Sequence, residues 1–150
     1  MTTIKHIEKL DIFKGLSKEE LETIAGLTEM VKVPKGEALF QEKDDAKHIY
    51  ILLKGKVRIQ VQLSSKPETV AITVLTQTGQ LIGWSGLMPE QYYTAAAICQ
   101  EDSELLAIEG VKLMSTLEKD PVMGFKVMRK ISEVISSRLR NIQRTVLKTF

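Results

Sequence analysis

Apolar residues recur with two different spacings, and the change from one to the other divides the chain. Residues 4–13 carry an apolar side chain at every third position, which predicts a short amphipathic helix. Apolar positions at helical spacing return in residues 18–27. Ser17 and Glu20 have the spacing of a capping box, so a second helix is predicted to begin after Ser17. We assign residues 1–29 to an N-terminal helical segment.

Residues 30–109 have a different pattern, in which short apolar or alternating runs are separated by turn residues. The strands that it predicts are 30–33, 38–40, 49–53, 56–62, 70–75, 94–99 and 104–108. Between them lie turns or polar loops at 34–36, 44–47, 54–55 and 64–67. Many short strands joined by such turns are typical of an antiparallel barrel or jelly roll. The fold class predicted is therefore mainly β, an antiparallel β-roll with flanking helices.

Helical spacing returns after the strands. Residues 111–117 predict one helix, and Asp120 followed by Pro121 predicts the start of a long one, because proline is favoured in the first turn. One apolar stripe follows the long helix for about five turns. Its members are Met128, Ile131, Ile135, Leu139, Ile142 and Val146. Residues 110–150 are thus a hinge and a long C-terminal helix, and 150 residues are enough for all three parts to form one domain.

The segment 79–95, called the glycine-rich loop below, has glycines at 79, 83 and 86 between two predicted strands. Glycine permits positive φ and the close approach of a ligand to the backbone. A turn that leads into a short helical piece also directs several N–H groups to one point, which suits a phosphate or another anion. The alternative is a loop that only reverses the chain, and spaced glycines by themselves do not decide between the two.

Charge is unevenly distributed. The net charge is +2, too small to indicate nucleic-acid binding, but the first 125 residues carry −4. The positive charge is concentrated in the long helix, at Lys126, Arg129, Lys130, Arg138, Arg140, Arg144 and Lys148. A run of charge on a helix usually faces solvent.

A single cysteine, Cys99, excludes an internal disulfide and fits a reducing compartment. It ends an apolar run, which predicts a buried structural thiol. The N-terminus has no apolar segment of signal-peptide length, and no run approaches the roughly 18 apolar residues of a membrane span. We expect a soluble cytoplasmic domain that does not contact a membrane.

The candidate chemistry for catalysis or metal binding is sparse. His6 and His48 are far apart in the sequence, so we expect solvated or packed histidines and no metal site. No nucleophile elbow, Walker loop or pair of catalytic carboxylates is present, and one cysteine cannot hold an iron–sulfur cluster. An enzyme is not expected.

Several ordered segments resemble the cyclic nucleotide-binding domain family, particularly the sensor domains of its catabolite-activator (Crp/Fnr) branch. These segments are residues 10–17, 36–40, 44–57 and 101–105, together with the terminal helix. The resemblance runs from about residue 7 to residue 145. It implies an eight-stranded β-roll flanked by helices, with the last helix forming a dimer.

In that family the glycine-rich loop is the phosphate-binding cassette, in which a Glu after glycine contacts the ribose and an Arg pairs with the cyclic phosphate. Here Trp84 and Tyr93 stand at those two positions, and Thr94 keeps the hydroxyl. The resemblance implies as ligand-binding residues Ile82, Gly83, Trp84, Ser85, Gly86, Tyr93, Thr94 and Ala95. Losing two charge-assisted contacts predicts that cAMP or cGMP binds weaker by several kcal/mol, roughly a thousandfold.

Other contacts are open to such a pocket. The N–H groups of Gly83, Trp84 and Ser85 could hold an anion, and Arg58 could replace the missing cation if its side chain points inward. The rings of Trp84 and Tyr93 could stack on an aromatic or apolar effector, or they could simply fill the pocket.

Two functions follow from these alternatives. The first is a regulatory sensor domain, in which a cyclic nucleotide or another small effector in the β-roll shifts a hinge near residues 110–121. The second is a degenerate module that binds no small molecule and serves as a dimerisation or scaffold unit. We expect a homodimer through residues 121–148, the alternative being a helix that folds back on its own barrel. The chain ends where the family's regulators begin a helix-turn-helix, so we expect no direct DNA binding.

Overall fold

Two four-stranded antiparallel sheets face each other and form the β-roll. One sheet has the order β1-β8-β3-β6, and the other has the order β2-β7-β4-β5. The computed structural model describes residues 2–63, 68–88 and 90–149, so the loop predicted at 64–67 lies outside the described residues. The strands are β1 (Thr28–Val33), β2 (Ala38–Phe40), β3 (His48–Lys54), β4 (Val57–Gln62), β5 (Thr69–Leu75), β6 (Leu81–Ile82), β7 (Ala96–Cys99) and β8 (Ser103–Glu109). The predicted β-roll is confirmed, but β6, inside the glycine-rich loop, was not expected.

In the sheet β1-β8-β3-β6, the strands β3, β6 and β8 are buried on both faces, whereas the edge strand β1 is partly exposed. Ile51 and Leu106 point to the helices, whereas Leu52 and Leu105 point into the roll. A strand covered on both sides has no polar face, which explains the continuous apolar run at 49–53. This sheet therefore joins the interior of the roll to the helical layer.

The sheet β2-β7-β4-β5 packs on one face only. Val57 and Ile59 of β4 contribute to the core of the roll, and alternation along the strand directs Arg58 to the opposite, outer face. Arg58 is accordingly absent from the lining of the cavity described below. It cannot serve as the inward cation that the sequence left open, because it lies on the wrong face of the sheet.

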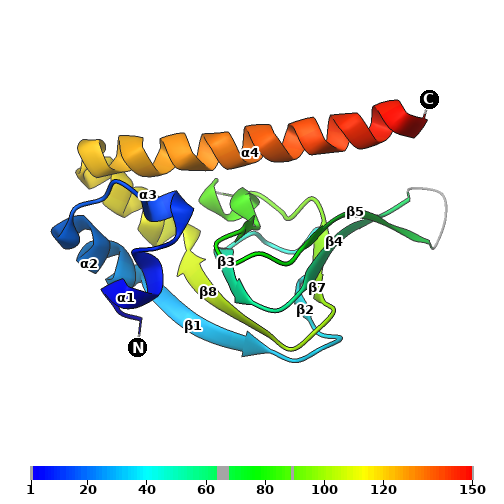
Figure 1. Cartoon of the computed structure of the whole chain (residues 1–150), viewed down its shortest axis with the longest axis horizontal. Coiled ribbons are helices and arrows are strands. Elements are labelled where there is room, and N and C mark those ends of the chain that lie inside the picture. Colours follow the sequence, from blue (N-terminus) through cyan, green and yellow to red (C-terminus); the bar gives the residue numbers. More distant parts are fainter. Residues whose placement is uncertain (1, 64–67, 89, 150) are drawn as a thin grey trace.

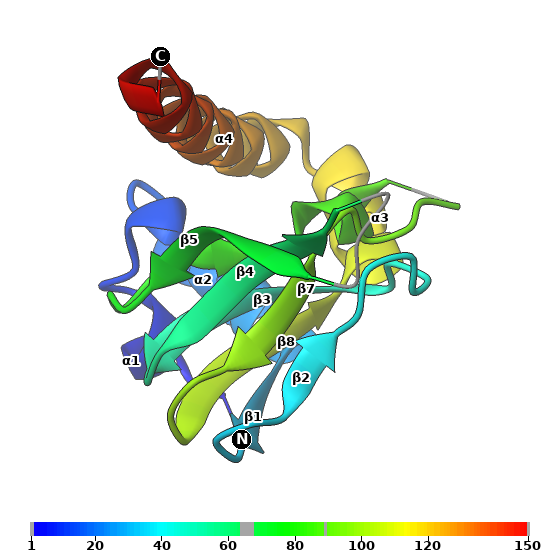
Figure 2. The same ribbon diagram turned by 90° about the vertical axis from the view of Figure 1, so that its right-hand side faces the viewer.

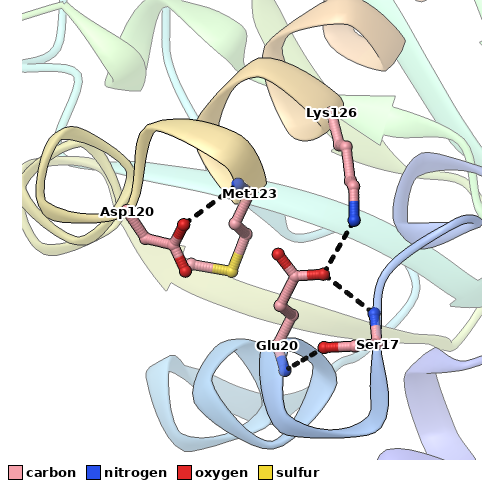
Figure 3. Close-up of polar contacts among 5 residues, drawn as sticks. All are labelled: Ser17, Glu20, Asp120, Met123 and Lys126. Atoms are coloured by element: carbon pink, nitrogen blue, oxygen red, sulfur yellow. Dashed lines mark hydrogen bonds and ion pairs between the residues drawn. The ribbon is translucent and has the colours of Figure 1, made fainter.

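The N-terminal segment contains three short helices: α1 (Ile4–Ile7), η1 (Asp11–Phe13) and α2 (Lys18–Leu27). The expectation of one helix over 4–13 is wrong, because Leu10 and Phe13 donate backbone hydrogen bonds three residues back. An apolar residue at every third position matches the three residues per turn of a 3₁₀-helix better than the 3.6 residues per turn of an α-helix. The capping box is confirmed (Figure 3): Ser17 N donates to Glu20 Oε1 at 2.9 Å, and Glu20 N donates to Ser17 Oγ at 3.1 Å.

Two helices follow β8, namely α3 (Gly110–Lys119) and α4 (Pro121–Thr149). Asp120 caps α4 by accepting a hydrogen bond from Met123 N at 3.2 Å (Figure 3). Figure 1 shows α4 extending along one side of the whole domain, from α3 to above the far ends of β4 and β5. Figure 2, turned by 90°, shows α4 above the β5 side of the roll.

The predicted apolar stripe of α4 does not face a single environment. Ile131 is 1% exposed and packs in the core of this chain, whereas Leu139 is 54% exposed. The first half of the helix therefore folds back on the core of its own chain, where it packs mainly against α3 and η1. The second half keeps apolar side chains in solvent.

Candidate ligand-binding site

The glycine-rich loop turns sharply at the end of β6. Gly83 has φ +78°, a left-handed conformation that glycine adopts without steric cost, and it leads into a single 3₁₀ turn, η2 (Trp84–Leu87). Gly86 serves a different purpose, since a Cβ at this position would lie 2.6 Å from the carbonyl oxygen of His48. These two glycines let the loop lie directly against β3.

A cavity of about 190 Å³ lies between this loop, the inner face of the second sheet and α4. The loop contributes Gly83, Trp84, Ser85, Tyr93, Thr94 and Ala95 to its lining. The remaining lining residues are Phe40, Ile59, Ile72, Thr73, Arg138 and Ile142. The helix that ends the chain thus closes a pocket that the loop and the strands open.

Tyr93 forms one wall of the cavity and is 5% exposed. Its ring stacks on Phe40 with centroids 3.7 Å apart and planes 11° apart. Its hydroxyl donates to His48 O at 2.5 Å and accepts from His48 N at 3.2 Å. Burial raises the pKa of Tyr93 to about 12, although the hydrogen bond to His48 opposes this shift. Tyr93 is therefore a fixed, neutral part of the wall.

Trp84 and Arg138 meet where α4 crosses the loop. The guanidinium carbon of Arg138 lies 4.7 Å from the centroid of the Trp84 ring, a cation–π geometry. Burial lowers the pKa of Arg138 to about 10, so the side chain still carries its charge at neutral pH. Among the described residues, no carboxylate pairs with Arg138. The pocket thus holds one partly buried cation, which lies on the face of the Trp84 ring.

The family model of the cyclic nucleotide-binding domain matches residues 30–120 of this sequence. The chain belongs to the cyclic nucleotide-binding domain family. It is 28% identical over 130 residues to the cyclic AMP receptor protein of Thermus thermophilus, an alignment that covers 86% of this chain. The chain spans 57% of that relative's length.

Solved structures agree on the fold. A cyclic nucleotide-binding domain from Methylobacillus flagellatus superposes with a TM-score of 0.84 at 18% identity, covering 98% of this chain and 82% of the other. The Thermus thermophilus catabolite activator protein gives 0.74 at 24% identity, with 90% and 61% of the two chains covered. At these identities the likeness establishes the architecture of this family member.

Six of the eight residues assigned to the site from the sequence line the cavity. Ile82 instead packs inside the roll, and Gly86 packs against His48. Phe40 and Arg138 also line the cavity, although neither was expected there from the sequence. Arg138 did leave a signal, because it stands seven residues after Ile131 and four before Ile142, on the apolar face of its helix.

Cys99, His6 and His48, the other candidates named from the sequence, do not line this cavity. Cys99 is fully buried and burial raises the pKa of its thiol, as expected for a structural cysteine. His6 Nδ1 accepts a hydrogen bond from Thr3 N at 2.9 Å. Within the described ranges, no group of three His, Cys, Asp or Glu side chains could hold a metal ion. None of the described helices is long and apolar enough to cross a membrane.

Proposed function

We propose that this chain is an effector-responsive regulatory domain, in which occupancy of the roll cavity changes how α4 docks on the glycine-rich loop. The observation that carries the proposal is the shared cavity: Trp84 comes from the loop, Arg138 comes from α4, and both line the same space. A ligand in this space contacts both elements at once. It therefore has a direct means of favouring one position of α4 over another.

A second contact supports the coupling. Gly110, the first residue of α3, lies so close to η2 that a Cβ there would overlap the carbonyl oxygen of Gly86. Leu87 of the same turn packs in one core with Leu113 of α3 and Met123 of α4. A movement of the loop is thus transmitted by close packing to both helices, since packed cores do not deform continuously.

Thermal unfolding with and without ligands tests this function. Purified protein is titrated with cAMP, cGMP, cyclic di-GMP, phenylacetate and benzoate. Hydrogen exchange of residues 134–148 is followed in parallel. An effector raises the melting temperature and changes exchange in this segment. A melting temperature that does not move with any of these compounds rejects the proposal.

The second function, a module without a ligand, is favoured by the Phe40–Tyr93 stack, which fills part of the pocket with side chains. The double variant Trp84→Glu, Tyr93→Arg separates the two functions, because it restores both charged positions of the family cassette. Gain of cAMP binding means that the scaffold is intact and its ligand has changed. Failure to bind cAMP in a folded double variant favours the module without a ligand.

We also propose a homodimer through residues 121–148. Its support is the outward face of α4, where Val122, Phe125, Leu139 and Val146 are exposed at coiled-coil spacing. Phe125 is 67% exposed, a large apolar area to leave in water. Sedimentation velocity of the full chain tests the assembly: Phe125→Glu with Leu139→Glu converts a dimer to a monomer, and a wild-type monomer up to high micromolar concentration contradicts it.

A further inference from the structure

The roll cavity has a lining suited to a ring. Trp84, Tyr93 and Phe40 contribute aromatic faces, and Ile59, Ile72 and Ile142 contribute aliphatic side chains. Hydroxyls occur only at Ser85, Thr73, Thr94 and Tyr93 within the described lining, and the Tyr93 hydroxyl is already bonded to His48. Such a surface favours a flat apolar group, because aromatic faces and aliphatic side chains gain most by excluding water from one another.

The charge in the cavity has one sign. Arg138 is the only ionisable side chain of the described lining apart from the neutral phenol of Tyr93, and none of the described lining residues is acidic. A guanidinium has five N–H donors, and the ring of Trp84 covers only its face. The edge of the Arg138 guanidinium remains suited to a carboxylate, which it can bind through two parallel hydrogen bonds.

The size of the cavity selects among anions. About 190 Å³ is below the 300–1,000 Å³ typical of pockets for drug-sized ligands. A cavity of roughly 150 Å³ is enough for one benzene ring. The enclosed space therefore fits one ring with a short acidic arm, and a whole nucleoside phosphate would extend beyond it.

We infer that the ligand class of this pocket is a small aromatic monocarboxylate, with its ring between Trp84 and the Phe40–Tyr93 stack and its carboxylate on Arg138. The inference rests on the proposed function, since it names the effector class of the same site. The carboxylate would neutralise a cation that belongs to α4, and the ring would contact the glycine-rich loop. One small molecule would thus join the two elements whose docking the domain is proposed to control.

The only tryptophan of the sequence provides a direct readout, because Trp84 lies in the wall of the cavity. Emission of the full chain is titrated with phenylacetate and with benzoate at constant ionic strength. Phenylacetamide has the same shape as phenylacetate without the charge and serves as the matched neutral ligand. We expect a saturable change with the acids and binding of the amide that is about ten- to hundredfold weaker, the range of a charge-assisted hydrogen bond.

Arg138→Gln should abolish this preference, so that acid and amide bind about equally. The ratio of the two affinities within one variant is the quantity compared, because a distorted pocket weakens both ligands alike. Arg140→Gln is the matched control: Arg140 is exposed, bonds Ser136 at 3.1 Å and does not line the cavity, so the ratio stays as in the wild type. Arg138→Lys keeps the charge and should retain part of the preference.

The outcomes separate this inference from the proposed function. A saturable response to cAMP together with no response to the acids overturns the ligand class but leaves the effector-responsive domain standing. Equal affinities for phenylacetate and phenylacetamide in the wild type overturn the role of Arg138. No response to any of the acids or cyclic nucleotides rejects both.

Discussion

The two halves of α4 are held in different ways. In the first half, residues 121–133, Met123, Val127 and Ile131 are buried in the main core. Lys126 in this half bonds Glu20 of α2 at 3.0 Å (Figure 3). In the second half, residues 134–149, no described side chain is fully buried, and Arg138 and Ile142 contact the roll at the cavity.

Under the proposed function, this difference divides the helix into an anchor (residues 121–133) and a responsive arm (residues 134–149). Because its large aliphatic side chains are buried in the core, the first half can detach only when the whole domain unfolds. The second half is only partly buried: Val134 and Ile135 pack against the main core, whereas Arg138 and Ile142 make the contacts around the cavity that a ligand would change under the proposed function. A domain that signals ligand binding through α4 needs both halves. If the first half were not fixed in the core, a change in the cavity contacts would not move the second half to a defined position.

The largest expected effect is in the anchor. Ile131→Ala removes a side chain that is 1% exposed and should lower the free energy of unfolding by about 2–4 kcal/mol, from lost burial and the cavity left behind. Leu139 is 54% exposed, so Leu139→Ala should change the free energy of unfolding of the monomer by less than about 0.5 kcal/mol. Urea unfolding at low protein concentration measures both, and equal losses would contradict the division of α4.

The next effect is in the arm. Trp84→Ala removes the half-buried ring that lies against the Arg138 guanidinium. It should lower the free energy of unfolding by about 1–2 kcal/mol. Amide exchange in residues 134–148 should rise by about tenfold, while residues 121–133 keep their protection. Tyr92→Ala is the control, because it removes an exposed aromatic side chain from the same loop. Uniform acceleration along α4 would show that the two halves open together.

The wall of the cavity should respond to alkaline pH. Tyr93→Phe removes two hydrogen bonds to His48 and should lower the free energy of unfolding by about 1 kcal/mol at neutral pH. Because the folded-state pKa of Tyr93 is raised to about 12, its neutral phenol contributes stability below pH ~10, the ordinary tyrosine value, and this contribution is lost between about pH 10 and 12. Chemical denaturation across this window should show a steeper loss in the wild type than in Tyr93→Phe.

The smallest effect concerns the link between α2 and α4. The backbone hydrogen bond from Ser17, together with Lys126, holds the pKa of Glu20 below its ordinary value. The ionised carboxylate therefore contributes stability above pH ~4.3, and the contribution is lost as the pH falls through the lowered folded-state pKa. Glu20→Gln should lower stability by about 0.5–1 kcal/mol at pH 7 and by less at pH 3. A loss that is independent of pH would mean that the charge of Glu20 has no part in it.

Much of the candidate site could be predicted because the glycine-rich loop is contiguous in the sequence. Gly83, Trp84 and Tyr93 lie within eleven positions of one another, and their departure from the family pattern is visible residue by residue. Phe40 and Arg138 could not be assigned in this way. They are 98 residues apart in the chain, and only the closure of the roll and the course of α4 bring them to one cavity.

Local patterns alone determined most elements of this protein, through the period of two along strands such as β4, the capping box at Ser17 and Glu20, and the start of the long helix at Pro121. Each of these features depends on interactions between residues a few positions apart, so it can be predicted from the sequence without the tertiary structure. The tertiary structure decided which face of each helix or strand packs in the core, lines the cavity or faces solvent. It directed Arg58 outward and Arg138 onto Trp84, because the facing of a side chain depends on packing between distant segments, and no local spacing specifies that packing.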